Sequence, residues 1–249
     1  MVDPRNILDR MVRKFERRAQ LDDSDRKALR GLPYDLKLME AGRYIVREGS
    51  SPDHSALLVS GLAYRHKITA EGARQIVSIH VPGDFVDLEG SLLNVVDHNI
   101  QALTRSEVAL IRSSSLLELV NKHPRIARAM WIDTIIDGSI FREWVVNVGR
   151  RDARERLAHL MCEFARRLEA AGMGSPDGYE LPMTQEQLGD ATGLTSVHVN
   201  RTLKSLADDG LIVRERRFIR IPDWEKMRAI AGFNETYLHL DQVGGASPR

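Results

Sequence analysis

Cysteine and long apolar runs are what this sequence most clearly lacks. The single cysteine in 249 residues, Cys162, cannot form an intramolecular disulfide and excludes an iron–sulfur cluster held by the cysteines of one chain. We expect Cys162 to be a small buried apolar residue. Residues 1–18 lack the apolar core of a signal peptide, and no uncharged apolar run is long enough to span a bilayer. The sequence therefore predicts a cytoplasmic protein with no membrane contact.

An excess of charge is also missing, since the formal net charge of the whole chain is +1. The 43% hydrophobic and 29% charged residues are typical of a folded globular protein, and the length suits two domains. Residues 194–228 depart from this balance, because they hold eight Lys or Arg against five Asp or Glu. Such a local excess of positive charge favours binding to phosphate groups.

Residues 184–221 carry the most specific local pattern in the chain. Thr184 suits the N-cap of a helix, and Gln187 three positions later completes a capping box. Gly193 lies where a short turn needs a residue with positive φ, and Thr195 can cap the helix that follows. This order predicts two helices joined by a tight turn, the helix-turn-helix arrangement.

The second helix of this motif is expected to have one apolar face and one polar face. Helical spacing places three apolar residues on the core side: Val199, Leu203 and Leu206. The opposite side then carries polar and cationic groups, including Asn200, Arg201 and Lys204. Arg201 can donate two parallel hydrogen bonds to guanine, and Asn200 can bind adenine in a similar way.

A hairpin is predicted after Gly210, where apolar runs at 211–213 and 218–221 flank a charged turn at 214–217. Its basic tip suits the phosphate backbone and completes a winged helix-turn-helix. The sequence therefore predicts double-stranded DNA as a partner; the alternative is a solvated helical hairpin with surface charge. The predicted DNA contacts are Thr195, Ser196, Val197, His198, Asn200, Arg201, Lys204, Arg214, Arg216 and Arg217.

Short runs with a period of two residues fill most of residues 43–113. Turn residues separate them, namely Gly49, Gly61, Gly72 and Pro82-Gly83. Many short strands at regular spacing predict a jelly-roll, here called the β-roll. Helical patterns at residues 7–18, 24–31 and 115–122 flank it.

Residues 124–149 are expected to form one long helix. Its apolar stripe recurs every four residues, at Ile132, Ile136, Ile140, Trp144 and Val148, and Ile135 and Val145 lie beside it. We expect this stripe, through Ile132, Ile136, Ile140 and Trp144, to form the interface of a homodimer, with its other flank resting on the β-roll; the alternative is packing on the β-roll alone.

The fold class that follows is α+β. Residues 1–123 are expected to form the helices and the β-roll, and residues 124–150 the dimerisation helix. Residues 151–232 are expected to form the winged helix-turn-helix domain. Residues 233–249 are expected to be a tail, disordered over its last residues, 244–249.

Three motifs in the β-roll are similar to those of the cyclic-nucleotide-binding domain. They are Val46-Arg47-Glu48-Gly49, Val59-Ser60-Gly61 and Pro82-Gly83-Asp84-Phe85. Together with the long helix and the winged domain, they make residues 21–223 resemble the Crp/Fnr family of bacterial transcription regulators. The resemblance implies a homodimer on a near-palindromic promoter site, contact with RNA polymerase, and an effector on the roll that modulates DNA binding.

The chain departs from the nucleotide-binding members of that family where the effector would bind. The predicted effector residues are Asp87, Leu88, Glu89, Gly90 and Ser91, followed by Asn99, Ile100 and Gln101. The second group has no arginine to hold a cyclic phosphate, and Asp87 and Glu89 would repel an anion. Neither cyclic AMP nor cyclic GMP is therefore the expected effector; a cyclic nucleotide and haem stay open as alternatives, with neither favoured.

Interpretations from other classes also stay open. Four histidines in the β-roll could bind haem or a metal, although none are paired at ligand spacing: His54, His66, His80 and His98. A cupin-like metalloenzyme needs closely spaced histidines, which this sequence lacks, so we assign no catalytic residue and no metal site. A β-roll without any ligand, which only supports a DNA-binding dimer, is the remaining alternative.

Overall fold

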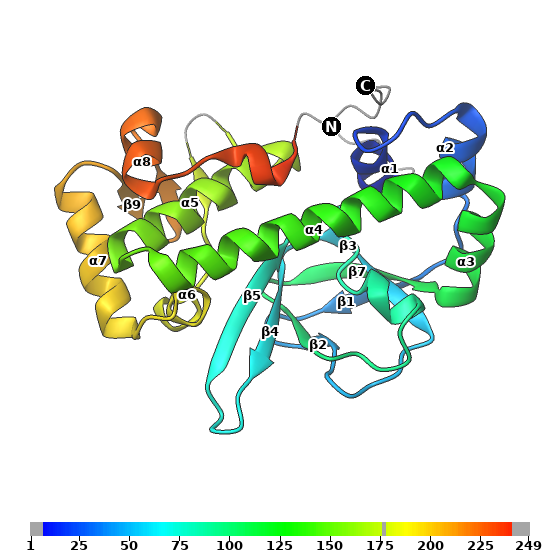
Figure 1. Ribbon diagram of the computed structural model, residues 1–249, viewed down its shortest axis with the longest axis horizontal. Helices are drawn as coiled ribbons and strands as arrows, with labels where there is room; N and C mark the ends of the chain where they lie inside the picture. Colours follow the sequence, from blue (N-terminus) through cyan, green and yellow to red (C-terminus); the bar gives the residue numbers. More distant parts are fainter. Residues whose placement is uncertain (1–6, 176–177, 241–249) are drawn as a thin grey trace. The chain divides into compact units, whose positions relative to one another are not determined.

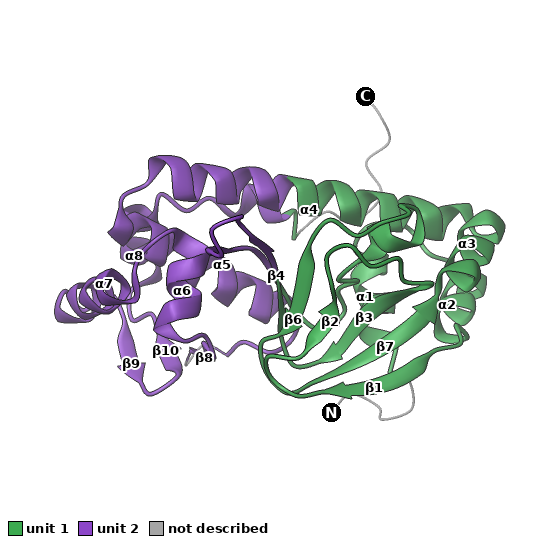
Figure 2. Cartoon of the chain, turned by 90° about the horizontal axis from the view of Figure 1, so that it is seen from below, with its two compact units in different colours: residues 1–65, 79–138, 239–249 green, residues 66–78, 139–238 purple. Residues whose placement is uncertain are grey.

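The computed structural model describes residues 7–175 and 178–240. The chain divides into two compact units, shown in different colours in Figure 2. The first unit comprises residues 1–65, 79–138 and 239–249, and the second comprises residues 66–78 and 139–238. The disorder expected at residues 244–249 lies outside the described residues.

The first unit is built on a β-roll, as the sequence predicted (Figure 1). The strands of the roll are β1 (Asp35–Met39), β2 (Tyr44–Val46), β3 (His54–Ser60), β4 (Ala63–Ile68), β5 (Arg74–His80), β6 (Asn99–Ala102) and β7 (Ser106–Arg112). The end of β4 and most of β5, within residues 66–78, are assigned to the second unit. They form one sheet with the order β1-β7-β3 and a second with the order β2-β6-β4-β5. Gly61 forms the turn between β3 and β4 at φ +78°, and a Cβ there would lie 2.3 Å from Ser106 Oγ, so only glycine fits.

Strand β3 shows how the period-two pattern builds the core. Leu57 packs in one apolar cluster, and its neighbours Ala56 and Leu58 pack in another. Successive side chains of a strand point to opposite faces, so a strand buried on both faces must be apolar at every position. This explains why residues 56–59 form an uninterrupted apolar run.

The helices that precede and follow the strands in the sequence pack on the roll. They are α1 (Asp9–Glu16), α2 (Asp23–Arg30), α3 (Ser113–Lys122) and the first part of α4 (Pro124–Arg150). Met11 and Phe15 of α1 are fully buried in the same apolar cluster as Leu57 and Ile126. The predicted helices at 7–18, 24–31 and 115–122 are therefore confirmed, with ends that shift by at most two residues.

A buried ion-pair cluster joins α1 to α4 in this unit. Lys14 Nζ lies 2.9 Å from Asp84 and 2.6 Å from Asp133. Burial alone would lower the pKa of Lys14, but the carboxylates of Asp133 and Asp84 outweigh it and raise the pKa. Burial, and next the charge of Asp133, raise the pKa of Asp137 to about 6. Sequence periodicity did not predict this cluster, because its members come from distant segments.

The exposed side of α4 differs from the expected stripe. Ile136, Ile140 and Trp144 are 4%, 6% and 6% exposed, so they belong to the chain's own core, and Ile132 is half-buried. The indole N–H of Trp144 donates to both carboxylate oxygens of Glu163, at 3.0 and 3.1 Å. The apolar residues that α4 exposes are Trp131, Ile135, Val145 and Val146.

Besides residues 66–78 and the last part of α4, the second unit contains further helices and a small sheet (Figure 1). Its elements include α5 (Ala153–Ala170), β8 (Tyr179–Glu180), α6 (Gln185–Thr192), α7 (Ser196–Asp208), β9 (Val213–Glu215), β10 (Phe218–Arg220), α8 (Trp224–Ala231) and the 3₁₀ turn η2 (Glu235–Leu238). Helix α5 packs against α6, α7 and α8, and the strands form a sheet with the order β8-β10-β9. Among the described residues, no helix is both long enough and apolar enough to cross a membrane.

Cys162 lies in α5 with none of its surface exposed, as expected for a small apolar residue. Burial raises the pKa of its thiol to about 12, so the thiol stays protonated near neutral pH.

Candidate nucleic-acid interface

Helix α6 begins with the predicted capping box. The backbone N–H of Gln187 donates to Thr184 Oγ1 at 3.1 Å, and the N–H of Thr184 donates to Gln187 Oε1 at 2.9 Å. Two backbone donors at the helix start are thereby satisfied by side chains. Thr184 and Gln187 therefore fix where the first helix of the motif begins.

The turn between α6 and α7 depends on two glycines. Gly193 ends α6 in the left-handed conformation, at φ 67° and ψ 34°, as the sequence predicted. At Gly189, an added Cβ would lie 2.4 Å from the carbonyl oxygen of Leu194. The chain can therefore turn back closely on α6 only because position 189 has no side chain.

Helix α5 holds this turn through Arg156, which sequence reasoning missed. Arg156 Nη1 donates to the carbonyl oxygen of Thr192 at 2.9 Å, and its Nε donates to the carbonyl oxygen of Arg151 at 2.8 Å. Arg154 donates to Ser205 Oγ at 3.0 Å, and it pairs with Asp209 at 2.5 Å. These contacts fix α6 and α7 against α5, and no local pattern marks them because their partners are far apart in sequence.

Helix α7 has the two faces predicted for it. Val199, Leu203 and Leu206 are 0%, 4% and 0% exposed and form its inner face. The residues exposed on the outer face include Ser196, Val197, Asn200, Arg201 and Lys204, while His198 is half-buried. Thr195 caps the helix, because its Oγ1 accepts a hydrogen bond from the N–H of His198 at 3.3 Å.

The wing is a hairpin of β9 and β10 with a two-residue turn. Glu215 and Phe218 are paired across it, so Arg216 and Arg217 form the tip. The side chains of Arg214, Arg216 and Arg217 are all exposed. Three cations on one short hairpin can contact neighbouring phosphates on a nucleic-acid backbone.

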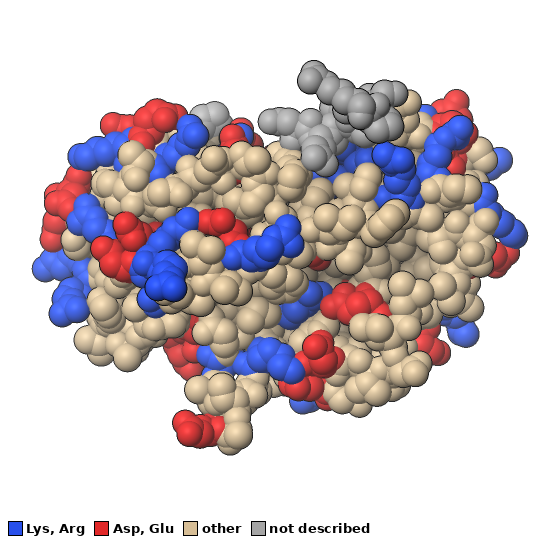
Figure 3. All heavy atoms as spheres, viewed as in Figure 1, with Lys and Arg blue, Asp and Glu red and all other residues tan. Residues whose placement is uncertain are grey.

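Charge is not gathered over a large area of the face shown in Figure 3. Lys and Arg alternate there with Asp and Glu, and neither sign covers the surface. The described residues form no broad positive surface for a polyanion on this face, and the exposed cations of α7 and the wing form a local positive group.

The first group of predicted effector residues surrounds a buried charge network in the β-roll. Residues 88–91 form a 3₁₀ turn, η1 (Leu88–Ser91). Glu89 pairs with Arg65 Nη2 at 2.9 Å and lies 3.5 Å from His98 Nε2. Arg65 also donates to the carbonyl oxygen of Val86 at 2.7 Å. The sequence did not identify Arg65 because it lies in β4, far from Glu89 along the chain.

The carboxylate of Asp87 is fully buried beside this network. Its Oδ1 accepts a hydrogen bond from the N–H of Ala56 at 2.7 Å. Burial raises its pKa to about 7, against the effect of that hydrogen bond, and the charge of Glu89 adds to the rise. Burial, and next the charge of Arg65, lower the pKa of His98.

The second group makes its contacts with β4 and with the segments that flank β2. Gln101 accepts a hydrogen bond from the hydroxyl of Tyr64 at 2.6 Å and donates to the carbonyl oxygen of Gly42 at 3.1 Å. Asn99 accepts from the N–H of Glu48 at 3.1 Å, and Ile100 lies in the apolar core. The polar groups predicted to hold an effector therefore bind partners within the chain.

Comparison with known protein families decides the identity. Residues 155–230 match the sequence pattern of the Crp-like helix-turn-helix domain. Residues 36–123 match that of the cyclic nucleotide-binding domain. The chain has the two domains of a Crp/Fnr-type transcription regulator. It is a DNA-binding transcription regulator and not an enzyme, as predicted.

Similarity to individual proteins supports this assignment. It is 29% identical to the transcriptional activator protein FnrL of Cereibacter sphaeroides over 218 residues, which are 86% of this chain and 87% of FnrL. It is 26% identical to the fumarate and nitrate reduction regulatory protein of Salmonella typhi over 198 residues, 79% of this chain and 78% of that protein. The solved structure of FixK2 from Bradyrhizobium japonicum matches with a TM-score of 0.74 at 25% identity, covering 80% of this chain and 98% of FixK2.

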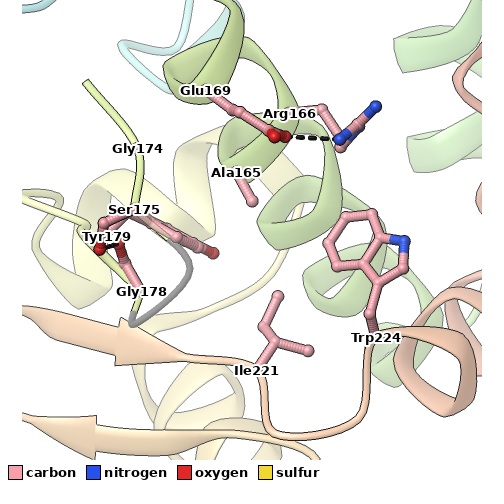
Figure 4. Close-up of a pocket in the computed structure, with 9 residues that line it drawn as sticks. All are labelled: Ala165, Arg166, Glu169, Gly174, Ser175, Gly178, Tyr179, Ile221 and Trp224. Atoms are coloured by element: carbon pink, nitrogen blue, oxygen red, sulfur yellow. Dashed lines mark hydrogen bonds and ion pairs between the residues drawn. The ribbon is translucent and has the colours of Figure 1, made fainter. Parts of the chain in front are cut away.

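The second unit of the regulator also contains a pocket of about 370 Å³ (Figure 4). Its walls come from α5, the segment around β8 and the start of α8, and include Arg166, Tyr179, Ile221 and Trp224. None of the predicted DNA or effector residues lines this pocket. In the described part of the chain, no group of three or more His, Cys, Asp or Glu is placed to hold a metal ion.

Proposed function

We propose that this regulator binds a near-palindromic promoter site as a homodimer in the bacterial cytoplasm, with α7 in the major groove. The observation that carries the proposal is the outer face of α7, where Asn200, Arg201 and Lys204 are exposed while the opposite face is buried. The exposed wing arginines supply contacts to the phosphate backbone. Helix α7 thus provides base contacts and the wing holds the domain in place.

The homodimer is supported by the apolar residues that α4 leaves exposed. Trp131, Ile135 and Val145 are 69%, 54% and 68% exposed, and their spacing places them on one side of the helix. An exposed apolar line of this kind is stabilised when it packs against its copy. A two-fold pair also supplies two copies of α7, which a palindrome with half-sites about 34 Å apart requires.

An effector other than cyclic AMP, acting through the β-roll, is the second part of the proposal. The carboxylate of Glu89 disfavours a bound phosphate, and Arg65 is already paired with Glu89. The bound regulator then contacts RNA polymerase to change transcription of the adjacent gene.

A second candidate is DNA binding without any effector. It is favoured by the hydrogen bonds that Asn99 and Gln101 make within the chain, which leave these side chains already satisfied. In this candidate the β-roll only supports the dimer. The two candidates differ in whether a small molecule changes DNA affinity.

Selection from genomic DNA tests both. The purified full chain is incubated without effector with genomic fragments near physiological salt, and the retained DNA is sequenced. Enrichment of a palindrome with half-sites about one helical turn apart is the expected result. The affinity for that site is then measured with cyclic AMP, haem and a small-molecule extract. A change with an additive supports the sensor; no change supports the ligand-independent dimer. Failure to enrich any site, with or without additives, overturns the proposed function.

A further inference from the structure

Val197 is the most exposed large apolar side chain in the described part of the chain. Its side chain is 79% exposed at the second position of α7, whereas the other valine of that helix, Val199, is fully buried. A β-branched residue also lowers helix propensity slightly relative to alanine. Neither core packing nor helix formation therefore explains a valine at position 197.

The position of Val197 on α7 places it with the predicted base contacts. Val197, Asn200, Arg201 and Lys204 are spaced at i, i+3, i+4 and i+7, so they share one side of the helix. Val197 and Arg201 are four positions apart, which corresponds to about 6 Å along the helix axis. Adjacent base pairs are about 3.4 Å apart, so Val197 lies within about two base pairs of the one that Arg201 contacts.

The chemistry of valine selects what it can contact in the major groove. Its side chain has neither donor nor acceptor, and the C5-methyl of thymine is the apolar group that a base edge presents there. Any other base edge opposite Val197 would lose water from a polar group without gaining a hydrogen bond. The side chain therefore distinguishes thymine from the other bases by its methyl group.

We infer that Val197 is a specificity residue that packs against the C5-methyl of a thymine, next to the base pair contacted by Arg201. The inference rests on the proposed function, because it requires α7 to lie in the major groove. The inference names both partners of one apolar contact, the side chain of Val197 and the C5-methyl group of a thymine. The half-site is accordingly expected to contain a required thymine within two base pairs of the position controlled by Arg201.

Replacing thymine by deoxyuridine tests this contact directly. The substitution removes the methyl group and keeps every hydrogen-bonding group of the base. A binding site is first selected with the wild-type full-length protein, and each thymine of the half-site is then replaced in turn. At one thymine, wild-type affinity should fall by about fourfold per half-site, the effect of losing one buried methyl group. In Val197→Ala, affinity for the thymine site should already be lower, and deoxyuridine at that position should cause no further loss.

Val95→Ala is the matched control, because Val95 is 56% exposed in the first unit and outside the DNA-binding elements. It should retain the full deoxyuridine effect. The inference is overturned if wild type loses no affinity at any deoxyuridine, or if Val197→Ala loses as much as wild type at the same thymine. If wild type selects no site under any condition, the proposed function fails, and that outcome is distinct from a selected site that is insensitive to the methyl group.

Discussion

Asp87 shows how a single buried side chain couples the stability of the β-roll to pH. Burial raises the pKa of its carboxyl group from 3.8 to about 7. Between these values the folded protein keeps the proton that the unfolded chain has released. The stabilisation from the protonated group is therefore fully present below pH 3.8 and is lost as the pH rises through about 7.

The substitution Asp87→Asn should remove this contribution to pH dependence. An asparagine imitates the protonated carboxyl group and does not titrate. As the pH rises from 5 to 8, the melting temperature of the variant should therefore increase relative to that of the wild type. Thermal unfolding of both proteins across this range measures the difference. Asp35→Asn, an exposed position on β1, is the control and should follow wild type. A constant difference between Asp87→Asn and wild type would contradict the prediction.

Two exposed cations of α7 should have separable effects on DNA binding. Arg201→Ala should weaken specific binding by about 1–3 kcal/mol and relax the preference at one base position. Lys204→Ala should instead weaken binding to all sequences alike. The slope of the logarithm of the binding constant against the logarithm of the salt concentration, here called the salt slope, should fall in magnitude by about 1. Binding-site selection and affinity measurements at several salt concentrations distinguish them. An unchanged binding motif in Arg201→Ala would remove Arg201 from base recognition.

The wing hairpin carries local strain in its turn. Arg216 has φ 56°, and the paired strands leave only Arg216 and Arg217 to reverse the chain. Glycine adopts this conformation without steric cost, whereas a larger residue there costs about 1 kcal/mol or more. An arginine in this position does not favour folding, so its presence supports a role for the side chain in contact with DNA.

Replacing Arg216 by glycine should therefore separate stability from binding. Arg216→Gly should raise the melting temperature, because the strain is relieved, and should lower DNA affinity with a smaller salt slope. Arg217→Gly is the matched control, since it removes the same charge from the same turn at a residue without positive φ. It should weaken binding similarly but should not raise the melting temperature. Equal thermal effects of the two substitutions would argue against strain at Arg216.

Assembly of the whole molecule depends on which side of α4 is exposed. Ile135→Asp places a charge among the exposed apolar residues, so it should give a folded monomer by sedimentation and reduce affinity for a palindromic site. Ile136→Asp places a charge at a buried position and should lower the melting temperature instead. Leu92→Asp, at a residue 74% exposed in the loop after η1, is the control and should remain a dimer.

Sedimentation of Ile135→Asp at several concentrations gives the decisive result for this surface. A dimer as stable as wild type would show that the exposed line of α4 is not the interface. A monomer with an unchanged circular dichroism spectrum and melting temperature would support the proposed homodimer.

Local signals account for the parts of the site that the sequence predicted. The capping box at Thr184, the left-handed Gly193 and the apolar spacing of Val199 and Leu203 each depend on residues within one or two helical turns. The strands of the β-roll follow in the same way from period-two runs between turn glycines. Such features are visible in a single sequence because their causes lie within a few residues.

Contacts between distant segments could not be predicted in this way. Arg65 with Glu89, Arg156 with the end of α6, and Lys14 between Asp84 and Asp133 join residues that share no local pattern. Burial also changes the chemistry of these groups, since the pKa of a carboxyl group depends on the surroundings that the fold creates. The sequence identified the polar groups expected to hold an effector by their positions. It did not identify the partners within the chain that these groups bind.

Helix α4 makes the difference clearest. The sequence by itself determined that residues 124–149 form a helix with apolar residues, because periodicity and helix propensity act locally. It could not determine which of them are exposed, because the line containing Ile136 and the line containing Ile135 are both apolar, although they lie on different sides of the helix. Only the tertiary structure decided that Ile136, Ile140 and Trp144 are covered by the chain while Trp131, Ile135 and Val145 stay exposed. The physical reason is that burial depends on which surfaces the folded chain packs against the helix, and sequence spacing does not specify those surfaces.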